Sequence, residues 1–283
     1  FNKNFLLVSQ LGPRKNFENS VCWFIEEFID QEVGLVIKTN FRGNSIIDFT
    51  NVEKHLKSLL ERYENRKCKV YLLHGDLTPG QMTHLYTNPK ISALINIAHG
   101  EGFGLPMFEA AREGLPIITC GWSGQLDFLN HSGKDYFQSV DFTIRPVQKQ
   151  AVWKGVIEEE QMWAFADQGS YKMSLRFAVK NLDKLKAQEL QRLVLNKFSD
   201  ENLFKLFCNS IIGKSTFKPE PITGISFCIA TNGAKKDKTR QEIKSINNSM
   251  SKTTIPFEII IAGDTSNFEN IDCTLVHTPD DAH

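Results

Sequence analysis

The first two thirds of the chain alternate short apolar runs with segments whose apolar residues recur at helical spacing. The strands expected from the apolar runs are residues 5–9, 34–39, 69–73, 92–98 and 116–119. The helices expected from the spacing are residues 16–29, 50–63, 79–86 and 106–113, with a short helical turn at 124–129. Alternation of strand and helix at these intervals is typical of βαβ units. The pattern therefore predicts an α/β fold with a doubly wound parallel sheet.

The last third of the chain contains a break in this pattern. Three helical segments come first, over residues 170–182, 185–196 and 200–211. Residues 213–223, GKSTFKPEPIT, have two prolines and no apolar periodicity, which predicts a linker. A new strand, helix, strand and strand then follow over residues 225–230, 239–250, 257–262 and 273–277. We expect a first domain over 1–212 and an incomplete second α/β domain over 224–283, since roughly 60 residues are few for a domain.

Composition excludes several classes of protein. With 283 residues, 41% of them hydrophobic, the chain can form about two globular domains. The 33 basic and 33 acidic residues cancel, so no broad basic field for a nucleic-acid partner is expected. No apolar run has membrane-spanning length, and six cysteines without a CxxC pair predict buried thiols of a reducing, cytoplasmic compartment. Because the chain starts at Phe1 and stops at His283 within a pattern, we expect both ends to be cut.

The most informative stretch is residues 99–109, which read HGEGFGLPMFE. Three glycines follow an expected strand and lead into an expected helix that begins at Pro106, where the missing N–H of proline costs nothing. Glycines let a ligand approach the backbone, and a helix N-terminus directs free N–H groups at an anion. The pattern predicts a phosphate site, and a tight turn with a solvated glutamate is the alternative interpretation.

The full string is more specific than its glycines. Glu101 and Glu109, eight residues apart around GFGLP, resemble the EX7E motif of the family 4 retaining glycosyltransferases, which have the GT-B fold of two facing Rossmann-like domains. The resemblance covers residues 1–212 and implies the C-terminal, nucleotide-sugar-binding domain. It implies that Glu101 contacts hydroxyls of the transferred sugar and that Glu109 holds the donor ribose. The donor-binding backbone would come from Gly102, Phe103, Gly104 and Leu105.

A second matching segment is residues 9–16, which read SQLGPRKN. Family members carry an arginine just after the first strand and a lysine a few residues later, and both hold the donor diphosphate. The resemblance implies this role for Lys15, as a catalytic residue beside Glu101. Gln10 or Ser9 stands in the place of the arginine, and Arg14 is the candidate to compensate. A basic pair on a solvated loop is the alternative interpretation.

Further loops of the first region are similar to donor-binding loops of the family. Gly12 belongs to the turn that carries Lys15, and Gly75, in the segment HGDL, matches the turn whose backbone reads the nucleobase. His99 directly precedes the glycine-rich turn and is expected to contact a phosphate or a sugar hydroxyl. A plain turn at Gly75 and a histidine satisfied at a strand end are the alternatives.

Residues 122–125, WSGQ, fall where the family has a second loop of small residues near the phosphates. Trp153 and Trp163 resemble aromatic positions late in such domains, and we expect both in the core. These positions complete the resemblance in the first domain.

The second region resembles the start of a family 2 type glycosyltransferase with the GT-A fold. It reads ISFCIATNG, then an amphipathic helix, then PFEIIIAGD. The resemblance implies nucleotide contacts from Thr231, at the end of the first strand, and from Asp264, after the second; Gly263 replaces an acidic residue often found there. The metal-binding DxD motif of that fold would come later in the chain, so we assign no metal site, although a complete second domain could use a divalent metal.

Together these resemblances predict a glycosyltransferase. A nucleotide-diphosphate sugar would be the donor, a glycan or another hydroxyl compound the acceptor, and the anomeric configuration would be retained. Lys15 and the helix N-terminus after Gly104 would stabilise the leaving diphosphate without a metal or cofactor. A sugar-nucleotide epimerase or phosphorylase of the GT-B fold is one alternative, and a non-catalytic nucleotide-sugar-binding module is another. Without the acceptor half, we expect this chain to bind a donor weakly and to transfer little sugar.

Overall fold

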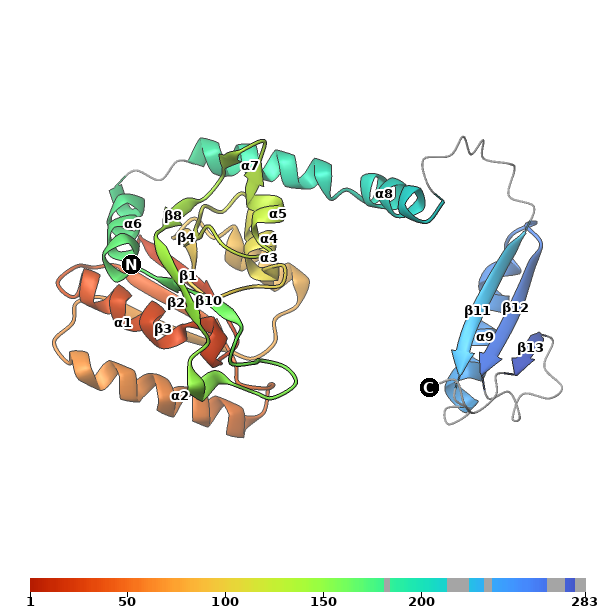
Figure 1. The fold of residues 1–283 in the computed structure, drawn as a ribbon, viewed down its shortest axis with the longest axis horizontal. Coiled ribbons are helices and arrows are strands. Elements are labelled where there is room, and N and C mark those ends of the chain that lie inside the picture. Colours follow the sequence, from red (N-terminus) through yellow and green to blue (C-terminus); the bar gives the residue numbers. More distant parts are fainter. Residues whose placement is uncertain (181–183, 213–223, 232–235, 264–272, 278–283) are drawn as a thin grey trace. The chain divides into compact units, whose positions relative to one another are not determined.

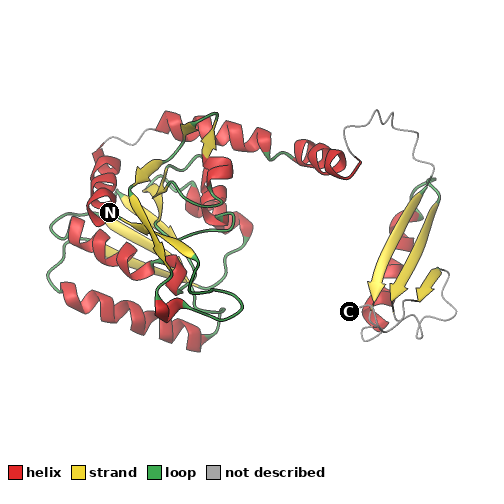
Figure 2. Cartoon of the chain, viewed as in Figure 1, coloured by secondary structure: helices red, strands yellow, loops and turns green. Residues whose placement is uncertain are grey.

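The computed structural model describes residues 1–180, 184–212, 224–231, 236–263 and 273–277, which belong to two compact units, Phe1–Cys208 and Asn209–His283 (Figure 1). Each unit combines helices with strands (Figure 2). The linker predicted over 213–223 lies outside the described residues, and the predicted domain limits stay predictions. None of the described helices is long and apolar enough to cross a membrane.

A six-stranded sheet forms the centre of the first unit, with the strand order β3-β2-β1-β4-β5-β8. Its strands are β1 Asn4–Val8, β2 Gly34–Thr39, β3 Lys69–His74, β4 Ile91–Asn96, β5 Ile117–Cys120 and β8 Gln138–Val140. All neighbouring strands in it pair in parallel. The predicted α/β class with a parallel sheet is confirmed. The sequence predicted five of these strands and missed β8, because three residues are too few to show a period.

Helices cover both faces of this sheet (Figure 1). They are α1 Phe17–Phe28, α2 Ile46–Leu60, α3 Pro79–Tyr86, α4 Leu105–Arg112, α5 Leu126–Leu129, α6 Gln168–Lys180 and α7 Lys184–Lys197, and α8 Asp200–Ile212 follows. Short 3-10 helices occur at η1 Pro13–Lys15, η2 Glu61–Tyr63 and η3 Lys149–Ala151. The helix α2 begins four residues before the predicted start because the Ser45 side chain caps it by accepting the Asp48 N–H.

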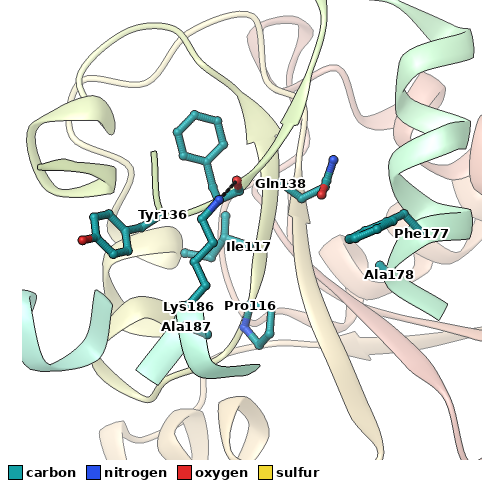
Figure 3. A pocket seen from close by; sticks show the side chains of 9 residues that line it. Pro116, Ile117, Tyr136, Gln138, Phe177, Ala178, Lys186 and Ala187 are labelled. Carbon is teal, nitrogen blue, oxygen red and sulfur yellow. Dashed lines mark hydrogen bonds between the residues drawn. The ribbon is translucent and has the colours of Figure 1, made fainter. Parts of the chain in front are cut away.

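Beside the outer strand β8, a pocket of about 170 Å³ separates β5 from α6 and α7 (Figure 3). Its lining includes Ile117 of β5, Tyr136 from the segment before β8, and Phe177 of α6. Lys186 of α7 donates a hydrogen bond to the Phe137 carbonyl at 3.2 Å. This bond ties α7 to the segment that leads into β8.

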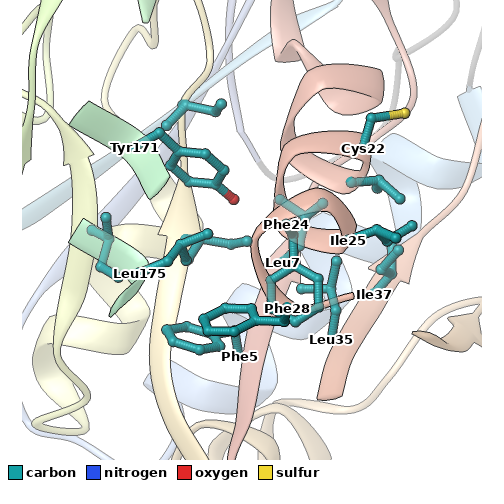
Figure 4. Close-up of a cluster of buried hydrophobic side chains, with 14 of the residues drawn as sticks. Phe5, Leu7, Cys22, Phe24, Ile25, Phe28, Leu35, Ile37, Tyr171 and Leu175 are labelled. Carbon is teal, nitrogen blue, oxygen red and sulfur yellow. The ribbon is translucent and has the colours of Figure 1, made fainter. Parts of the chain in front are cut away.

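Alternate residues of the strands point to opposite faces and form two cores. On the α1 face, Phe5 packs against Phe24 and Phe28 with ring centroids 5.8 Å from each (Figure 4). Tyr171 of α6 is fully buried in the same core. The face of α3, α4 and α7 buries a separate set that includes Leu6. Burial on both faces is expected for a parallel sheet, and it fixes the loops at the strand ends on a rigid frame.

An antiparallel hairpin of β9 Phe142–Pro146 and β10 Met162–Ala166 follows the sheet, after the two-residue strands β6 Asn130–His131 and β7 Lys134–Asp135. This hairpin was not predicted from the sequence. Trp163 on β10 is buried, as expected, but Trp153 is 67% exposed, so the prediction of a core position for it is wrong. Trp153 lies in the long connection between the two strands, where its backbone pairs with that of Ile157.

The second unit contains β11 Ile225–Thr231, α9 Lys236–Met250, β12 Phe257–Gly263 and β13 Thr274–His277, and its strands pair in parallel in that order. Its small core joins Ile243 of α9 to Ile259 and Ile261 of β12. The similarity of this unit to the GT-A fold stays a prediction. The prediction of buried thiols holds for the first three cysteines of the chain and is wrong for Cys228, which is exposed.

Candidate functional site

The order of the strands places the topological switch point of the sheet between β1 and β4. From β1 the chain continues to β2 on one side, and from β4 it continues to β5 on the other. The loops that leave the carboxyl ends of β1 and β4 therefore diverge, and ligands of doubly wound sheets bind at such a point. These loops are residues 9–16 and 97–104, the two segments in which the sequence predicted a phosphate site.

Glu101 joins the two loops through its carboxylate. The side chain of Lys15 donates to both carboxylate oxygens, with Nζ 2.6 Å from Oε1 and 2.8 Å from Oε2. Arg14 donates from Nη1 to Oε2 at 3.0 Å and also to the Gly100 carbonyl. Glu101 is only 7% exposed. Lys15 and Glu101, the predicted catalytic pair, thus lie in direct contact, and Arg14 joins them.

The charge state of this cluster follows from its contacts. Burial raises the pKa of the Glu101 carboxyl, but the hydrogen bonds and charges of Lys15 and then Arg14 outweigh burial and hold that pKa below its ordinary value. Glu101 is therefore ionised at neutral pH, and the cluster of two cations and one anion carries a net positive charge. Such a cluster can exchange its internal ion pair for contacts with an anionic ligand.

The glycine-rich turn has the backbone conformation that its sequence predicts. Gly104 has φ +87° and forms the N-cap of α4, and a Cβ there would lie 2.8 Å from the Met107 side chain. Phe103 packs its ring against Phe108 and Phe128, with centroids 5.1 Å apart in both pairs. The Phe103 side chain thus anchors the turn, which leaves its backbone for a ligand. Gly102 and Leu105 are exposed at the start of the helix.

The loop of residues 122–125 supports the turn from behind. Ser123 donates from Oγ to the Glu101 carbonyl at 2.6 Å and accepts the Glu101 N–H at 3.2 Å. Gly124 donates its N–H to the same carbonyl at 3.0 Å, and a Cβ on Gly124 would lie 1.9 Å from the Gly102 carbonyl oxygen. A residue with a side chain at position 124 would push the turn away, so glycine is required there by close approach.

Glu109 lies on α4 and is exposed to solvent. Its Oε2 accepts a hydrogen bond from the hydroxyl of Tyr86 at 2.8 Å. Tyr86, at the end of α3, is 2% exposed, and burial together with the Glu109 charge raises the pKa of its hydroxyl. The sequence gave no signal for this partner. Tyr86 fixes the direction of the Glu109 side chain and leaves its other oxygen for a ligand.

The turn after β3 is tied to the loop after β2. His74 contacts Asp48 with 2.8 Å between Nε2 and Oδ2, and Asp48 also accepts the backbone N–H groups of Phe41 and Arg42 at 3.0 and 2.9 Å. The His74 hydrogen bond, followed by these backbone bonds, lowers the pKa of Asp48 despite its burial. Gly75 follows with φ +99°, as a turn with glycine requires. Asp48, which the sequence did not single out, thus positions the turn predicted to bind the nucleobase.

His99 is buried, with 3% of its surface exposed, and connects three segments. Its backbone N–H donates to the Arg14 carbonyl at 2.8 Å, and its Nδ1 donates to the Ala164 carbonyl of β10 at 2.7 Å. Its ring stacks on Trp163 at 5.1 Å. Burial lowers the pKa of the imidazole, the hydrogen bond to Ala164 opposes this shift, and the nearby charge of Arg145 lowers the pKa further. His99 is therefore neutral at pH 7.

Two cavities meet at His99, with volumes of about 650 Å³ and 520 Å³. They share four lining residues, which are Asn16, Asn19, His99 and Gln148. The larger one continues to Trp23 and the β9–β10 hairpin, and the smaller one continues past Gly12 to the loop after β2. The two cavities together are named the His99 groove. Gly12, predicted to bind the donor, has extended backbone and lines this groove.

The structure says less about the two residues of the second unit that the sequence predicted to contact a nucleotide. Thr231 is the last residue of β11, and Asp264 lies outside the described residues. Among the residues that the structure describes, no group of three or more His, Cys, Asp or Glu side chains could hold a metal ion. Of the predicted site residues that the structure describes, Lys15, Arg14 and Glu101 are thus the ones joined by direct side-chain contacts.

Comparison with solved structures supports the fold. The chain is similar to apo OtsA, with a TM-score of 0.50 and 10% sequence identity over 76% of this chain and 44% of OtsA. Sucrose-phosphate synthase from Thermosynechococcus elongatus has a TM-score of 0.49, 15% identity, and coverage of 76% and 47%. The apo lipopolysaccharide outer core galactosyltransferase WaaB has a TM-score of 0.45, 19% identity, and coverage of 75% and 50%.

Neither a protein-family model nor a curated protein matches the chain. The chain spans less than half of OtsA and half or less of the other two structures. The likeness to OtsA confirms the Rossmann-like α/β fold predicted from the sequence.

Proposed function

We propose that the first unit binds a nucleotide-diphosphate sugar and forms the donor half of a retaining glycosyltransferase, which transfers the sugar to the hydroxyl of a glycan or another acceptor. The observation that carries the proposal is the contact of Lys15 and Arg14 with the buried Glu101 at the glycine-rich turn. The contact lies at the point of the sheet where ligands of this fold class bind. Its cations match a diphosphate and its carboxylate matches sugar hydroxyls.

The diphosphate would bind between Lys15, Arg14 and the N-terminus of α4. The cluster has a net positive charge before the ligand arrives, because two cations surround one carboxylate. A diphosphate that draws Lys15 away would free oxygens of Glu101 for the transferred sugar. The cations and backbone dipoles are held in place by the sheet, so they can stabilise the charge that develops on the leaving diphosphate without reorganising.

The nucleoside would extend along the other side of the turn. Glu109 is exposed and has one carboxylate oxygen bonded to Tyr86, so its second oxygen can accept hydroxyls of the ribose. The Gly75 turn, positioned through His74 and Asp48, would meet the base. These roles require hydrogen bonds alone and no covalent enzyme intermediate.

Transfer with retention would proceed by attack on the face that the diphosphate leaves. The bond between the anomeric carbon and the phosphate oxygen breaks while the bond to the acceptor oxygen forms, and the acceptor proton passes to the leaving phosphate. Protein groups supply orientation and charge stabilisation in this step. We propose that it requires no metal ion in the first unit.

Calorimetry of the 283-residue chain with UDP-, GDP- and ADP-glucose, in the presence of EDTA, tests the proposal. We expect one of these donors to bind, and Lys15→Met to weaken that binding at least tenfold, as the loss of a charge-assisted contact of about 1.5–3 kcal/mol implies. Lys57→Met, which removes an exposed lysine of α2, is the matched control and should bind normally. Failure of all three donors to bind, or equal binding by Lys15→Met, would contradict the proposal.

Release of nucleoside diphosphate in the presence of carbohydrate acceptors separates a transferase from a module that only binds. We expect Glu101→Gln, introduced into a full-length enzyme that contains the acceptor half, to reduce this release more than it reduces binding of the bare nucleoside diphosphate. Equal losses in the two measurements would argue against contact of Glu101 with the sugar.

A further inference from the structure

We infer that the His99 groove binds a carbohydrate, and that a sugar hydroxyl donates its hydrogen bond to Nε2 of His99. The inference rests on the proposed function, because a sugar bound next to the Gly100 turn is placed for transfer. It goes further by assigning the groove a ligand class and His99 a defined role as a hydrogen-bond acceptor.

The protonation of His99 is set by its neighbour. The partner of Nδ1 is a backbone carbonyl, which can only accept, so Nδ1 carries the proton of the neutral ring. Nε2 then presents a lone pair. The Nδ1 edge is turned to Ala164, and the ring lines both cavities of the groove, so the Nε2 edge is the one that can meet a ligand. Within the described part of the chain, no protein group hydrogen-bonds to Nε2.

A lone pair of this kind selects its ligand. It needs a donor such as a hydroxyl, and it repels a phosphate oxygen. The charged side chains of the groove include Arg145, Asp167 and Glu18, so positive charge does not dominate there. The groove therefore differs from the Lys15 cluster and does not suit a diphosphate.

The remaining lining fits a neutral compound rich in hydroxyls. Asn19 and Gln148 are carboxamides that can donate and accept, as hydroxyls do. Trp23 and Phe165 add aromatic surface beside these polar groups, and the guanidinium of Arg145 lies over the Phe165 ring at 4.6 Å. Apolar faces combined with a few placed polar groups are typical of a small-molecule site. Sugar rings have this mixture of C–H faces and hydroxyls.

The sugar has two possible sources, the acceptor and the transferred group of the donor. Both present the same hydroxyl chemistry to Nε2. An acceptor would bind without a nucleotide, whereas a transferred sugar would bind as part of the nucleotide sugar. The experiment separates these sources.

The decisive variant is His99→Asn. The shorter amide can keep the donor to the Ala164 carbonyl but places no acceptor where Nε2 lies. His84→Asn, on the exposed surface of α3, is the matched control. Each protein is titrated by calorimetry with a panel of free mono- and oligosaccharides, with UDP-, GDP- and ADP-glucose, and with the corresponding nucleoside diphosphates. Thermal unfolding verifies that the variants are folded.

We expect His99→Asn to weaken sugar binding about tenfold and to leave binding of the bare nucleoside diphosphate unchanged. Loss of free-saccharide binding identifies an acceptor, and loss confined to the nucleotide sugar identifies the transferred sugar. If the wild type binds no sugar in either form, or if His99→Asn binds both as the wild type does, the inference is wrong. Saccharide binding through His99 without any nucleotide binding would instead contradict the proposed function and keep the inference.

Two-dimensional 15N NMR of the histidine rings in the wild type reports the protonation of His99 directly, so this measurement does not depend on the folding of a variant. We expect the His99 ring to be neutral at pH 7 with its proton on Nδ1, and the Nε2 signal to shift when the sugar binds. A proton on Nε2 would overturn the inference.

Discussion

Two regions of the site contain the same side chain in opposite environments. Glu101, between the loops after β1 and β4, is buried and accepts hydrogen bonds from Lys15 and Arg14. Glu109, eight residues later on α4, is exposed and accepts one from Tyr86. The first carboxylate therefore contributes to the fold as well as to the site, whereas the second can be changed at little structural cost.

The spacing of the two glutamates in the motif does not predict that their surroundings differ. The spacing of eight residues places Glu101 four residues before α4 and Glu109 past its first turn, and the loop after β1 supplies cations to Glu101. A buried ion pair is costly to break from one side, because the remaining charge has no water around it. The two regions should therefore respond differently to substitution.

The largest effect is expected from Lys15→Met. It leaves the buried Glu101 carboxylate with Arg14 as its remaining cation, and we expect unfolding by urea to show a loss of about 2 kcal/mol. Removing the only partner of a buried charge costs about 3–5 kcal/mol of stability, and the loss here is smaller because Arg14 still pairs with Glu101. Lys15→Arg, which preserves the charge, is the control and should lose less. Equal stability of Lys15→Met and the wild type would mean that the cluster adds nothing to the fold.

A smaller change in the free energy of unfolding is expected when the pH is lowered. Because the folded-state pKa of Glu101 is lowered, its contribution to stability is present above the unfolded value of about 4.3 and is lost as pH falls through the folded value. The stability of Glu101→Gln should therefore change less with pH than that of the wild type below about pH 4.3. Urea unfolding between neutral and acidic pH measures the difference. Parallel profiles for the two proteins would contradict the ion pair.

The smallest effect on stability is expected from Glu109→Ala. An exposed carboxylate with one hydrogen bond should change the free energy of unfolding by less than about 1 kcal/mol. Donor binding should nevertheless weaken, because the proposed ribose contact is lost. Urea unfolding and calorimetry on the same protein test both parts. A variant with lowered stability and normal donor binding would reverse the contrast between the two glutamates.

The sequence predicted the frame of the first unit well because the strands are buried on both faces and the helices are amphipathic. The strand β2 and the helix α3 have the bounds that the pattern predicted. The hairpin β9–β10 was missed because its strands are partly exposed and are separated by a long connection. The core position predicted for Trp153 failed for the same reason.

Site residues that belong to a sequence motif could be predicted, whereas contacts between segments far apart in the sequence could not. Glu101 and Lys15 were each predicted as catalytic residues, but their direct contact and the hydrogen bond of Arg14 to the same carboxylate are features of the folded loops. Tyr86 and Ala164 gave no signal, since a tyrosine hydroxyl and a backbone carbonyl have no pattern in the sequence. The protonation of His99 depends on that carbonyl, and only the structure supplies it.

A crystal structure of the chain with a bound nucleoside diphosphate tests the central claim most directly. The account predicts the diphosphate within hydrogen-bond distance of Lys15 Nζ and of the backbone N–H groups of residues 102–104, with the ribose hydroxyls at Glu109. Glu101 should then have released at least one of its contacts with Lys15. A diphosphate bound away from Lys15, or a nucleotide bound by the second unit alone, would contradict the account.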